Sequence, residues 1–303
     1  MHYNDFGHWI RQQFPFRVQK LSVDAGFSCP NRDGKISTGG CVYCNNKTFN
    51  PSYCDNRKTI REQLEAGKTF FARKYPMMRY LAYFQAFTNT YDDLDTLKRK
   101  YEEALTVDDI VGIVIGTRPD CMPEDLLDYL ETLHRQVFVL IEYGIESTRD
   151  VTLRRINRGH DFACTRTALE RTAERQILCG GHIIIGLPGE SREDILDQAP
   201  VLSSLPLNIL KIHQMQIIKG TPLDVEFRKD PTICLLHSVD EYIQLIGDYL
   251  PYLRKDLVLE RFVSQSPKDL LTAPQWGLKN HEFTARLNNY LKEHNIFQGS
   301  ALP

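Results

Sequence analysis

The chain of 303 residues is long enough for one large domain or for a core domain with an appendage. Its hydrophobic fraction of 42%, charged fraction of 25% and net charge of -2 argue against a disordered chain and against a polyanion binder that is basic overall. No apolar run approaches the roughly 20 residues of a membrane span, and the N-terminus lacks a signal-peptide core. We therefore expect a cytoplasmic protein with no membrane partner, whose eight cysteines are reduced and serve metal ligation, catalysis or burial.

Short apolar runs rich in β-branched residues alternate with segments whose apolar residues recur at helical spacing. The apolar runs predict strands at 18–24, 80–87, 110–117, 137–145, 182–187 and 209–218. The segments with helical spacing predict helices at 59–75, 94–105, 123–135, 165–177 and 191–205. Such alternation is typical of an α/β fold with a parallel sheet and crossover helices. Six units over roughly 210 residues are too few for a closed eight-stranded barrel. We therefore predict a partial (β/α)6 barrel over residues 1–222.

The pattern changes after residue 222. A long helix is predicted at 237–253, a strand at 257–264 and a last helix at 281–293. We expect residues 223–303 to form a C-terminal α/β extension that packs on the core. In parallel α/β folds the chemistry lies at the C-terminal ends of the strands, so the functional residues are expected there.

The segment FSCPNRDGKISTGGCVYCNN, directly after the first predicted strand, places Cys29, Cys41 and Cys44 in a C-x11-C-x2-C pattern. Soft thiolates suit zinc or an iron–sulfur cluster. A closed structural zinc site needs four ligands, so three cysteines favour a 4Fe–4S cluster with one open iron. The alternative is a zinc knuckle completed by Cys54 or a distant histidine. Free cysteines are commonly buried, and among the others Cys121 is placed to reach the site.

Together with YLAYFQAFT, GTRPDC, RINRGHDF and the C-terminal GSAL, this segment resembles the radical S-adenosylmethionine (SAM) superfamily. The resemblance covers nearly the whole chain and is strongest to the branch of the Elongator catalytic subunit and oxygen-independent coproporphyrinogen oxidase, and within it to the YhcC-like group. It implies a 4Fe–4S cluster on the three cysteines and SAM at the open iron. It also implies reductive cleavage of SAM to a 5′-deoxyadenosyl radical, with an electron from a donor such as flavodoxin or ferredoxin. The superfamily's common spacing is C-x3-C-x2-C, so the first loop here is longer.

The same resemblance points to further SAM contacts at the ends of the second and third strands. In place of a Gly-Gly-Glu-like segment stand Gln85 and Ala86, so Gln85 and backbone carbonyls are expected to accept the methionyl amine of SAM. Gly116 stands where relatives carry a glutamate, which removes a carboxylate from that position. Arg118 and Asp120 either shape the site or cap the next helix.

The fourth strand ends in an E-x-G-x-E segment, similar to the E-x-G-x-Q-S of the branch. Glu142 and Glu146 are expected to point into the barrel mouth, toward the ribose of SAM or the substrate. The resemblance pairs Arg158 with the carboxylate of SAM, which a guanidinium can bind through two hydrogen bonds.

The fifth and sixth strands supply the remaining candidates. The backbone at Ile184 and Gly186 is expected to pair with adenine, as in the similar I-x-G-x-x-G-E motif of the superfamily. His182 either faces the cofactor or is a hydrogen-bonded core residue. Polar residues on an inner strand face are costly to bury without partners, so Lys211 or His213 is expected to contact substrate or cofactor.

The substrate has no motif of its own. The Elongator resemblance suggests tRNA or another nucleic acid, and Arg57, Lys58, Arg61 and residues 98–100 either form an RNA-facing patch or a solvated surface. The porphyrinogen oxidase resemblance suggests a small anionic metabolite instead. A different class of function is a non-catalytic iron–sulfur protein, such as a redox sensor.

Overall fold

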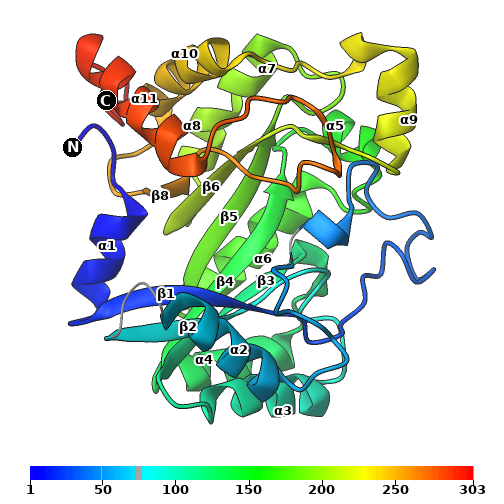
Figure 1. Ribbon diagram of the computed structural model, residues 1–303, viewed down its shortest axis with the longest axis vertical. Coiled ribbons are helices and arrows are strands. Elements are labelled where there is room, and N and C mark those ends of the chain that lie inside the picture. The colour runs from blue at the N-terminus through cyan, green and yellow to red at the C-terminus, as the bar shows by residue number, and fades with distance from the viewer. Residues whose placement is uncertain (49, 73–76, 303) are drawn as a thin grey trace.

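The computed structural model describes residues 1–48, 50–72 and 77–302. Within these residues, seven parallel strands form one curved sheet in the order β1-β2-β3-β4-β5-β6-β8 (Figure 1). The predicted α/β partial barrel is therefore confirmed. The strands are β1 (Arg17–Val23), β2 (Met78–Phe84), β3 (Ile110–Thr117), β4 (Phe138–Glu146), β5 (Leu178–Ile185), β6 (Ile209–Gln214) and β8 (Val258–Arg261), with β7 (Ile217–Ile218) and β9 (Leu271–Ala273) forming an antiparallel pair.

Most of the helices connect the strands and cover the outer face of the sheet, whereas α1 precedes the first strand. They are α1 (Phe6–Gln13), α2 (Ile60–Ala72), α3 (Leu94–Leu105), α4 (Glu124–His134), α5 (Asp150–Arg155), α6 (Phe162–Glu174), α7 (Arg192–Leu196), α8 (Gln198–Ser203), α9 (Pro222–Lys229), α10 (Val239–Tyr249) and α11 (Asn280–Glu293). Within the described part of the chain, none of them combines the length and the apolarity needed to cross a bilayer.

Several predicted boundaries shift for local reasons. The strand predicted at 80–87 ends at Phe84, because Ala86 and Phe87 adopt positive φ angles of 53° and 62°. The strand predicted at 209–218 divides into β6 and β7, and the helix predicted at 191–205 divides into α7 and α8 at Asp197. The end of the helix predicted at 59–75 lies outside the described residues. Helices α1, α5 and α9 were not predicted.

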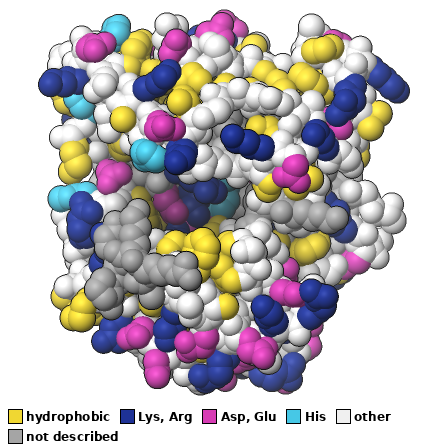
Figure 2. All heavy atoms as spheres, viewed as in Figure 1, with side chains coloured by type: hydrophobic (Ala, Val, Ile, Leu, Met, Phe, Trp, Pro, Cys, Tyr) yellow, Lys and Arg dark blue, Asp and Glu magenta, His cyan; other side chains and the backbone are white. Residues whose placement is uncertain are grey.

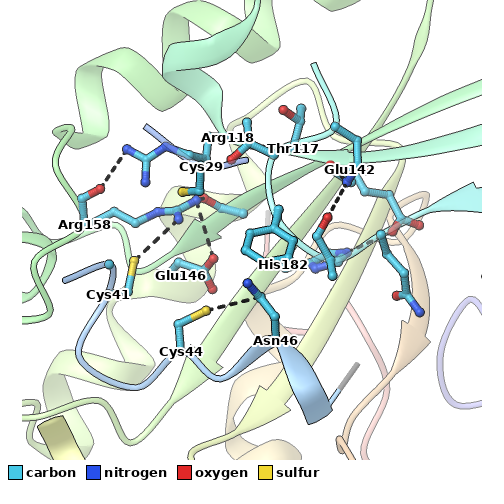
Figure 3. Close-up of a pocket in the computed structure, with 18 of the residues that line it drawn as sticks. Cys29, Cys41, Cys44, Asn46, Thr117, Arg118, Glu142, Glu146, Arg158 and His182 are labelled. Atoms are coloured by element: carbon cyan, nitrogen blue, oxygen red, sulfur yellow. Dashed lines mark hydrogen bonds and ion pairs between the residues drawn. The ribbon is translucent and has the colours of Figure 1, made fainter. Parts of the chain in front are cut away.

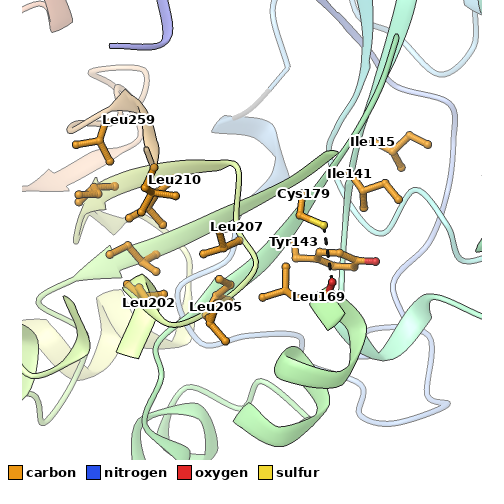
Figure 4. Packing of buried hydrophobic residues seen from close by; sticks show 14 of the residues in the cluster. Ile115, Ile141, Tyr143, Leu169, Cys179, Leu202, Leu205, Leu207, Leu210 and Leu259 are labelled. Atoms are coloured by element: carbon orange, nitrogen blue, oxygen red, sulfur yellow. Dashed lines mark hydrogen bonds between the residues drawn. The ribbon is translucent and has the colours of Figure 1, made fainter. Parts of the chain in front are cut away.

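The outer face of the sheet forms the main hydrophobic core. Tyr143 on β4, Cys179 on β5 and Leu210 on β6 are fully buried there, and Leu169 of α6 packs on them (Figure 4). Tyr143 carries the only hydroxyl among these four residues. This hydroxyl lies 2.8 Å from that of Thr172, so it has a hydrogen-bond partner inside the core. Alternate strand residues point to opposite faces, so this packing directs the intervening residues into the barrel.

The barrel interior is layered along the strands. Its lower layer is apolar, and helix α1 closes it from below with the buried Ile10. Two residues further along the same strands, on the same face, the side chains become polar or charged. The lower layer contains Val18, Leu81, Leu140, Ile209 and Val258, and the layer above it contains Lys20, Tyr83, Glu142, Lys211 and Glu260.

The C-terminal residues join the same sheet and the same core. Strand β8 pairs in parallel with β6, and this adds a seventh strand to the six that were predicted. Tyr242 and Ile246 of α10 and Phe283 of α11 are buried in the main core cluster. The predicted division at residue 222 stays a prediction.

Candidate active site

A cavity of about 180 Å³ lies at the C-terminal ends of the strands, where the sequence predicts the functional residues. Ten of the eleven predicted cluster and SAM residues line it: Cys29, Cys41, Cys44, Gln85, Ala86, Glu142, Glu146, Arg158, His182 and Ile184. Gly186 does not line it. Its φ is 91° and a Cβ atom there would lie 2.4 Å from the carbonyl oxygen of Leu235, so the glycine permits a close backbone approach.

The cysteine-bearing loop is folded by its own hydrogen bonds. The backbone N–H of Cys44 donates to the carbonyl of Cys41 at 3.0 Å, and Arg32 donates to the carbonyl of Cys44 at 2.7 Å. Gly40 has a φ of 74°, and a Cβ atom there would lie 2.9 Å from the side chain of Arg32. The loop therefore needs glycine at this position to bring Cys41 and Cys44 to the same cavity.

The pKa of the Cys44 thiol depends on the other two cysteines of the loop. Burial, and then the charges of Cys41 and Cys29, raise the pKa of the Cys44 thiol to about 11 despite the nearby guanidinium of Arg32. In the part of the chain that is described, no three His, Cys, Asp or Glu side chains are already arranged as a metal site. A cationic iron–sulfur cluster would stabilise the thiolates that burial disfavours, so the donor set fits such a group.

Two other cysteines are placed differently. The Cys54 thiol donates to the carbonyl of Ser22 at 2.9 Å, and burial raises its pKa to about 12. Burial also raises the pKa of the Cys121 thiol to about 12. Neither residue lines the cavity. These positions favour the interpretation of both as structural residues.

Arg158 reaches from the turn after α5 into the centre of the site (Figure 3). Its guanidinium donates to the carbonyl of Gly144 at 2.6 Å, lies 3.5 Å from the Glu146 carboxylate and lies 3.8 Å from the sulfur of Cys41. A side chain at Gly144 would clash with both Glu146 and Arg158, at 2.5 and 2.6 Å. Arg158 is 6% exposed, and its Nε has no partner among the described residues.

Arg118 supports this arrangement from β3. It forms two hydrogen bonds to Asp120, at 2.9 and 2.8 Å, and donates to the carbonyl of Arg158 at 2.8 Å. No side-chain cap is formed at the following helical turn, so the pair shapes the site. A second nitrogen of Arg118 and the buried side-chain oxygen of Asn31, beside Cys41, also lack partners within the described part of the chain. Arg118 and Arg158 both line the cavity, so their unpartnered nitrogens are candidate donors to a polar ligand.

The turn after β2 is held by a residue that sequence reasoning missed. Asn89 donates to the carbonyls of Ala86 and Gly116 at 3.0 and 2.8 Å, and Gln85 donates to the hydroxyl of Ser22 at 2.7 Å. Ala86 is held in the left-handed region, which is costly for a residue other than glycine. Ala86 lines the cavity, and Asn89 occupies one of the two lone pairs of its carbonyl oxygen.

The carboxylate of Glu142, which lines the cavity, is bound by three neighbouring side chains. Lys20, Lys211 and His182 lie 2.8, 2.6 and 3.0 Å from its two oxygens, and its side chain is fully buried. Burial raises the pKa of this carboxyl, but the two lysines outweigh burial and hold it well below its usual value. Lys211 lies in this layer and His213 lines the cavity itself.

The fold and the site together indicate the superfamily of the chain, because a partial parallel barrel carries three cysteines directly after its first strand. The chain belongs to the radical SAM superfamily: residues 33–198 match the superfamily, and residues 207–293 match the Radical_SAM C-terminal domain.

The chain is similar to particular members over nearly its whole length. It is 34% identical to the uncharacterized protein YtqA of Bacillus subtilis, over 98% of this chain and 92% of that protein. It is also 34% identical to the protein YhcC of Escherichia coli, over 99% of this chain and 95% of that protein.

Solved structures share the fold at lower identity. The Elp3 of Methanocaldococcus infernus superposes with a TM-score of 0.67 and 17% identity, over 93% of this chain and 64% of that one. Streptococcus suis SuiB, solved bound to S-adenosylmethionine, superposes with a TM-score of 0.52 and 12% identity, over 86% of this chain and 54% of that one.

Proposed function

We propose that the protein is a radical SAM enzyme that binds a 4Fe–4S cluster through Cys29, Cys41 and Cys44. The observation that carries the proposal is that these three cysteines line one cavity with the buried Arg158, inside a radical SAM fold. When bound, the cluster supplies the electron that cleaves SAM reductively to methionine and a 5′-deoxyadenosyl radical. The electron reaches it from a one-electron donor such as flavodoxin or ferredoxin.

The chain's own residues orient the cofactors and exclude competing reactions. Arg158 provides positive charge beside Cys41, with its Nε available for the carboxylate of SAM. The turn at Gln85 and Ala86 presents acceptors for the methionyl amine, and Glu146 lies on the ribose side. Ile184 and the backbone at Gly186 belong to the adenine side, where Gly186 acts through the close chain approach that it permits.

The test is SAM cleavage by the anaerobically reconstituted protein with dithionite. We expect 5′-deoxyadenosine from the wild type and only background from Cys44→Ala. Equal amounts from both would contradict the proposal and would favour the non-catalytic iron–sulfur protein. The eight free cysteines support a reducing, cytoplasmic location.

The substrate is proposed to be either a nucleic acid such as tRNA or a small anionic metabolite. The basic residues considered for RNA contact are largely engaged within the protein's own surface. Arg57 pairs with Asp55 at 2.6 Å, and Arg61 donates to the hydroxyl of Thr106 at 2.8 Å. Lys100 donates to the carbonyl of Ala25. These contacts give the tRNA alternative no specific support.

A further inference from the structure

A second cavity, of about 300 Å³, adjoins the cofactor cavity on the open side of the barrel, between the edge strands β1 and β8. The two cavities share Tyr83 and Gln85. Figure 2 shows a hollow on this face with acidic, basic and histidine side chains in its depth. We call the second cavity the charged chamber. A molecule placed in it would lie directly beside the proposed cofactor site.

Two lysines of the chamber are balanced by two carboxylates, Glu260 of the chamber and Glu142 of the adjoining cofactor cavity. Glu142 binds Lys20 and Lys211, and Glu260 lies 2.7 Å from Lys20 and 3.3 Å from Lys211. Lys211 is the more buried of the two lysines, with its side chain 3% exposed against 13% for Lys20, and it also lies 3.4 Å from the hydroxyl of Tyr83. This group of four is therefore electrically neutral and holds β1, β4, β6 and β8 together.

Arg261 is a fifth charge, and the described residues offer it no carboxylate within ion-pair distance. Its guanidinium lies 3.1 Å from Nε2 of His213 on the neighbouring strand. That nitrogen must accept the hydrogen bond, so His213 is neutral. Burial, and then the charge of Arg261, hold the pKa of His213 well below its usual value.

The second histidine does not compensate this charge either. The ring of His182 stacks on that of His213 with centroids 5.5 Å apart, and it binds Glu142 through Nε2. Burial lowers the pKa of His182, and neither histidine ring can carry a negative charge that would offset Arg261. The described side chains therefore leave the chamber with one excess positive charge, carried by Arg261. A partly buried cation without a counter-ion is unfavourable until an anion joins it.

We propose that the charged chamber binds a carboxylate or phosphate group of a small-molecule substrate, with Arg261 as its direct ligand. This inference rests on the proposed function, whose substrate class it narrows. A guanidinium can bind either group through two parallel hydrogen bonds, and Lys20 and Lys211 add positive potential behind it. Nucleic-acid backbones instead bind lysines and arginines on exposed surfaces, and Lys211 is buried.

The experiment is calorimetric titration of reconstituted, SAM-loaded protein with pyrophosphate, inorganic phosphate and succinate, and with a single-stranded RNA oligonucleotide. We expect at least one small anion to bind, Arg261→Gln to weaken it by about tenfold or more, and Arg261→Lys to retain part of the affinity. Arg286→Gln removes the same charge from the exposed face of α11 and should leave binding unchanged. The Lys variant covers the case in which the Gln variant fails to fold.

The outcomes are separable. The inference is overturned if both Arg261 variants bind the small anions as well as the wild type does. It is also overturned if Arg286→Gln loses binding to the same extent as the Arg261 variants. RNA binding that depends on Arg261 in the absence of any small-anion binding overturns it too. Wild-type protein that cleaves SAM but binds none of the anions also overturns it and leaves the proposed function intact. Protein that binds the anions through Arg261 but never cleaves SAM contradicts the proposed function alone.

Discussion

Arg158 connects the cysteine loop to the barrel. It contacts Cys41 from one side and the carbonyl of Gly144 from the other, while its own backbone carbonyl binds Arg118. Glu146, which ends β4 in the left-handed conformation, supplies the opposing charge at 3.5 Å. We propose two roles for a side chain so placed, namely to order the apo site and to present a cation to a ligand.

The structural role can be measured without any cofactor. Arg158→Gln leaves the largely buried Glu146 without its cation, and breaking a buried ion pair costs about 3 kcal/mol. We expect the free energy of unfolding of the apo protein, from urea denaturation, to fall by about that amount. Arg192→Gln removes an arginine from the exposed pair with Asp248 and should cost less than about 1 kcal/mol. Equal losses in both variants would contradict this role.

We expect the cysteines to separate into cluster ligands and structural residues, which a measurement of iron content can distinguish. Cys54→Ala removes a thiol that binds the carbonyl of Ser22 away from the cavity, so iron and sulfide per chain should match the wild type after anaerobic reconstitution. Cys44→Ala removes a cavity residue and should lose most of both. Loss of iron and sulfide in Cys54→Ala as well would contradict this assignment and make Cys54 a fourth cysteine ligand of the cluster.

The residues that sequence reasoning found were those with a local signal. Cys29, Cys41 and Cys44 share one segment, and Arg158 lies in a motif. The charged layer had only a weak signal, namely single charges such as Lys20 and Glu260 inside apolar strands. The two partners of Lys20, Glu142 and Glu260, lie 122 and 240 residues away from it in the chain. Only the register of the assembled sheet brings these residues together. Such contacts depend on the tertiary fold and have no local pattern.

At the scale of elements, α1 shows the same limit. It has eight residues, of which Ile10 alone is buried, so its periodicity is too short to predict a helix. Asp5 caps its first turn by accepting from the N–H of His8 at 3.0 Å. The helix then closes the lower end of the barrel, where Phe6 lies against Lys20 with the ammonium 4.8 Å from the ring centroid.

This closure predicts the effect of shortening one side chain. Ile10→Ala opens a cavity between α1 and the apolar layer, and such truncations cost about 2–4 kcal/mol. We expect a loss of that size in the free energy of unfolding, measured by urea denaturation. Arg11→Ala, on the exposed side of the same helix, should change it little. An equally small effect for Ile10→Ala would mean that α1 is not part of the folded core.

For the whole molecule, the open question is whether residues 223–303 unfold with the barrel. Strand β8 is hydrogen-bonded into the main sheet, and Lys20 and Glu260 join its two edge strands at 2.7 Å. The main hydrophobic cluster also includes residues of both parts. One continuous core and one continuous sheet favour a single cooperative transition, although chains of this size often unfold in steps.

The two tryptophans of the chain can test this directly, because they lie at opposite ends of the sequence. Trp9 packs against Phe138 below the barrel, and Trp276 stacks on Phe283 in the extension and donates to the carbonyl of His237 at 2.9 Å. Trp276→Phe leaves Trp9 as the fluorophore, and Trp9→Phe leaves Trp276. For each variant, we expect the urea transition measured by fluorescence to coincide with the transition measured by circular dichroism. A fluorescence transition of Trp276 that precedes loss of the sheet would instead define residues 223–303 as a unit that unfolds separately. The charged chamber would then lie between two independently stable parts, because β1 and β8 supply its opposite walls.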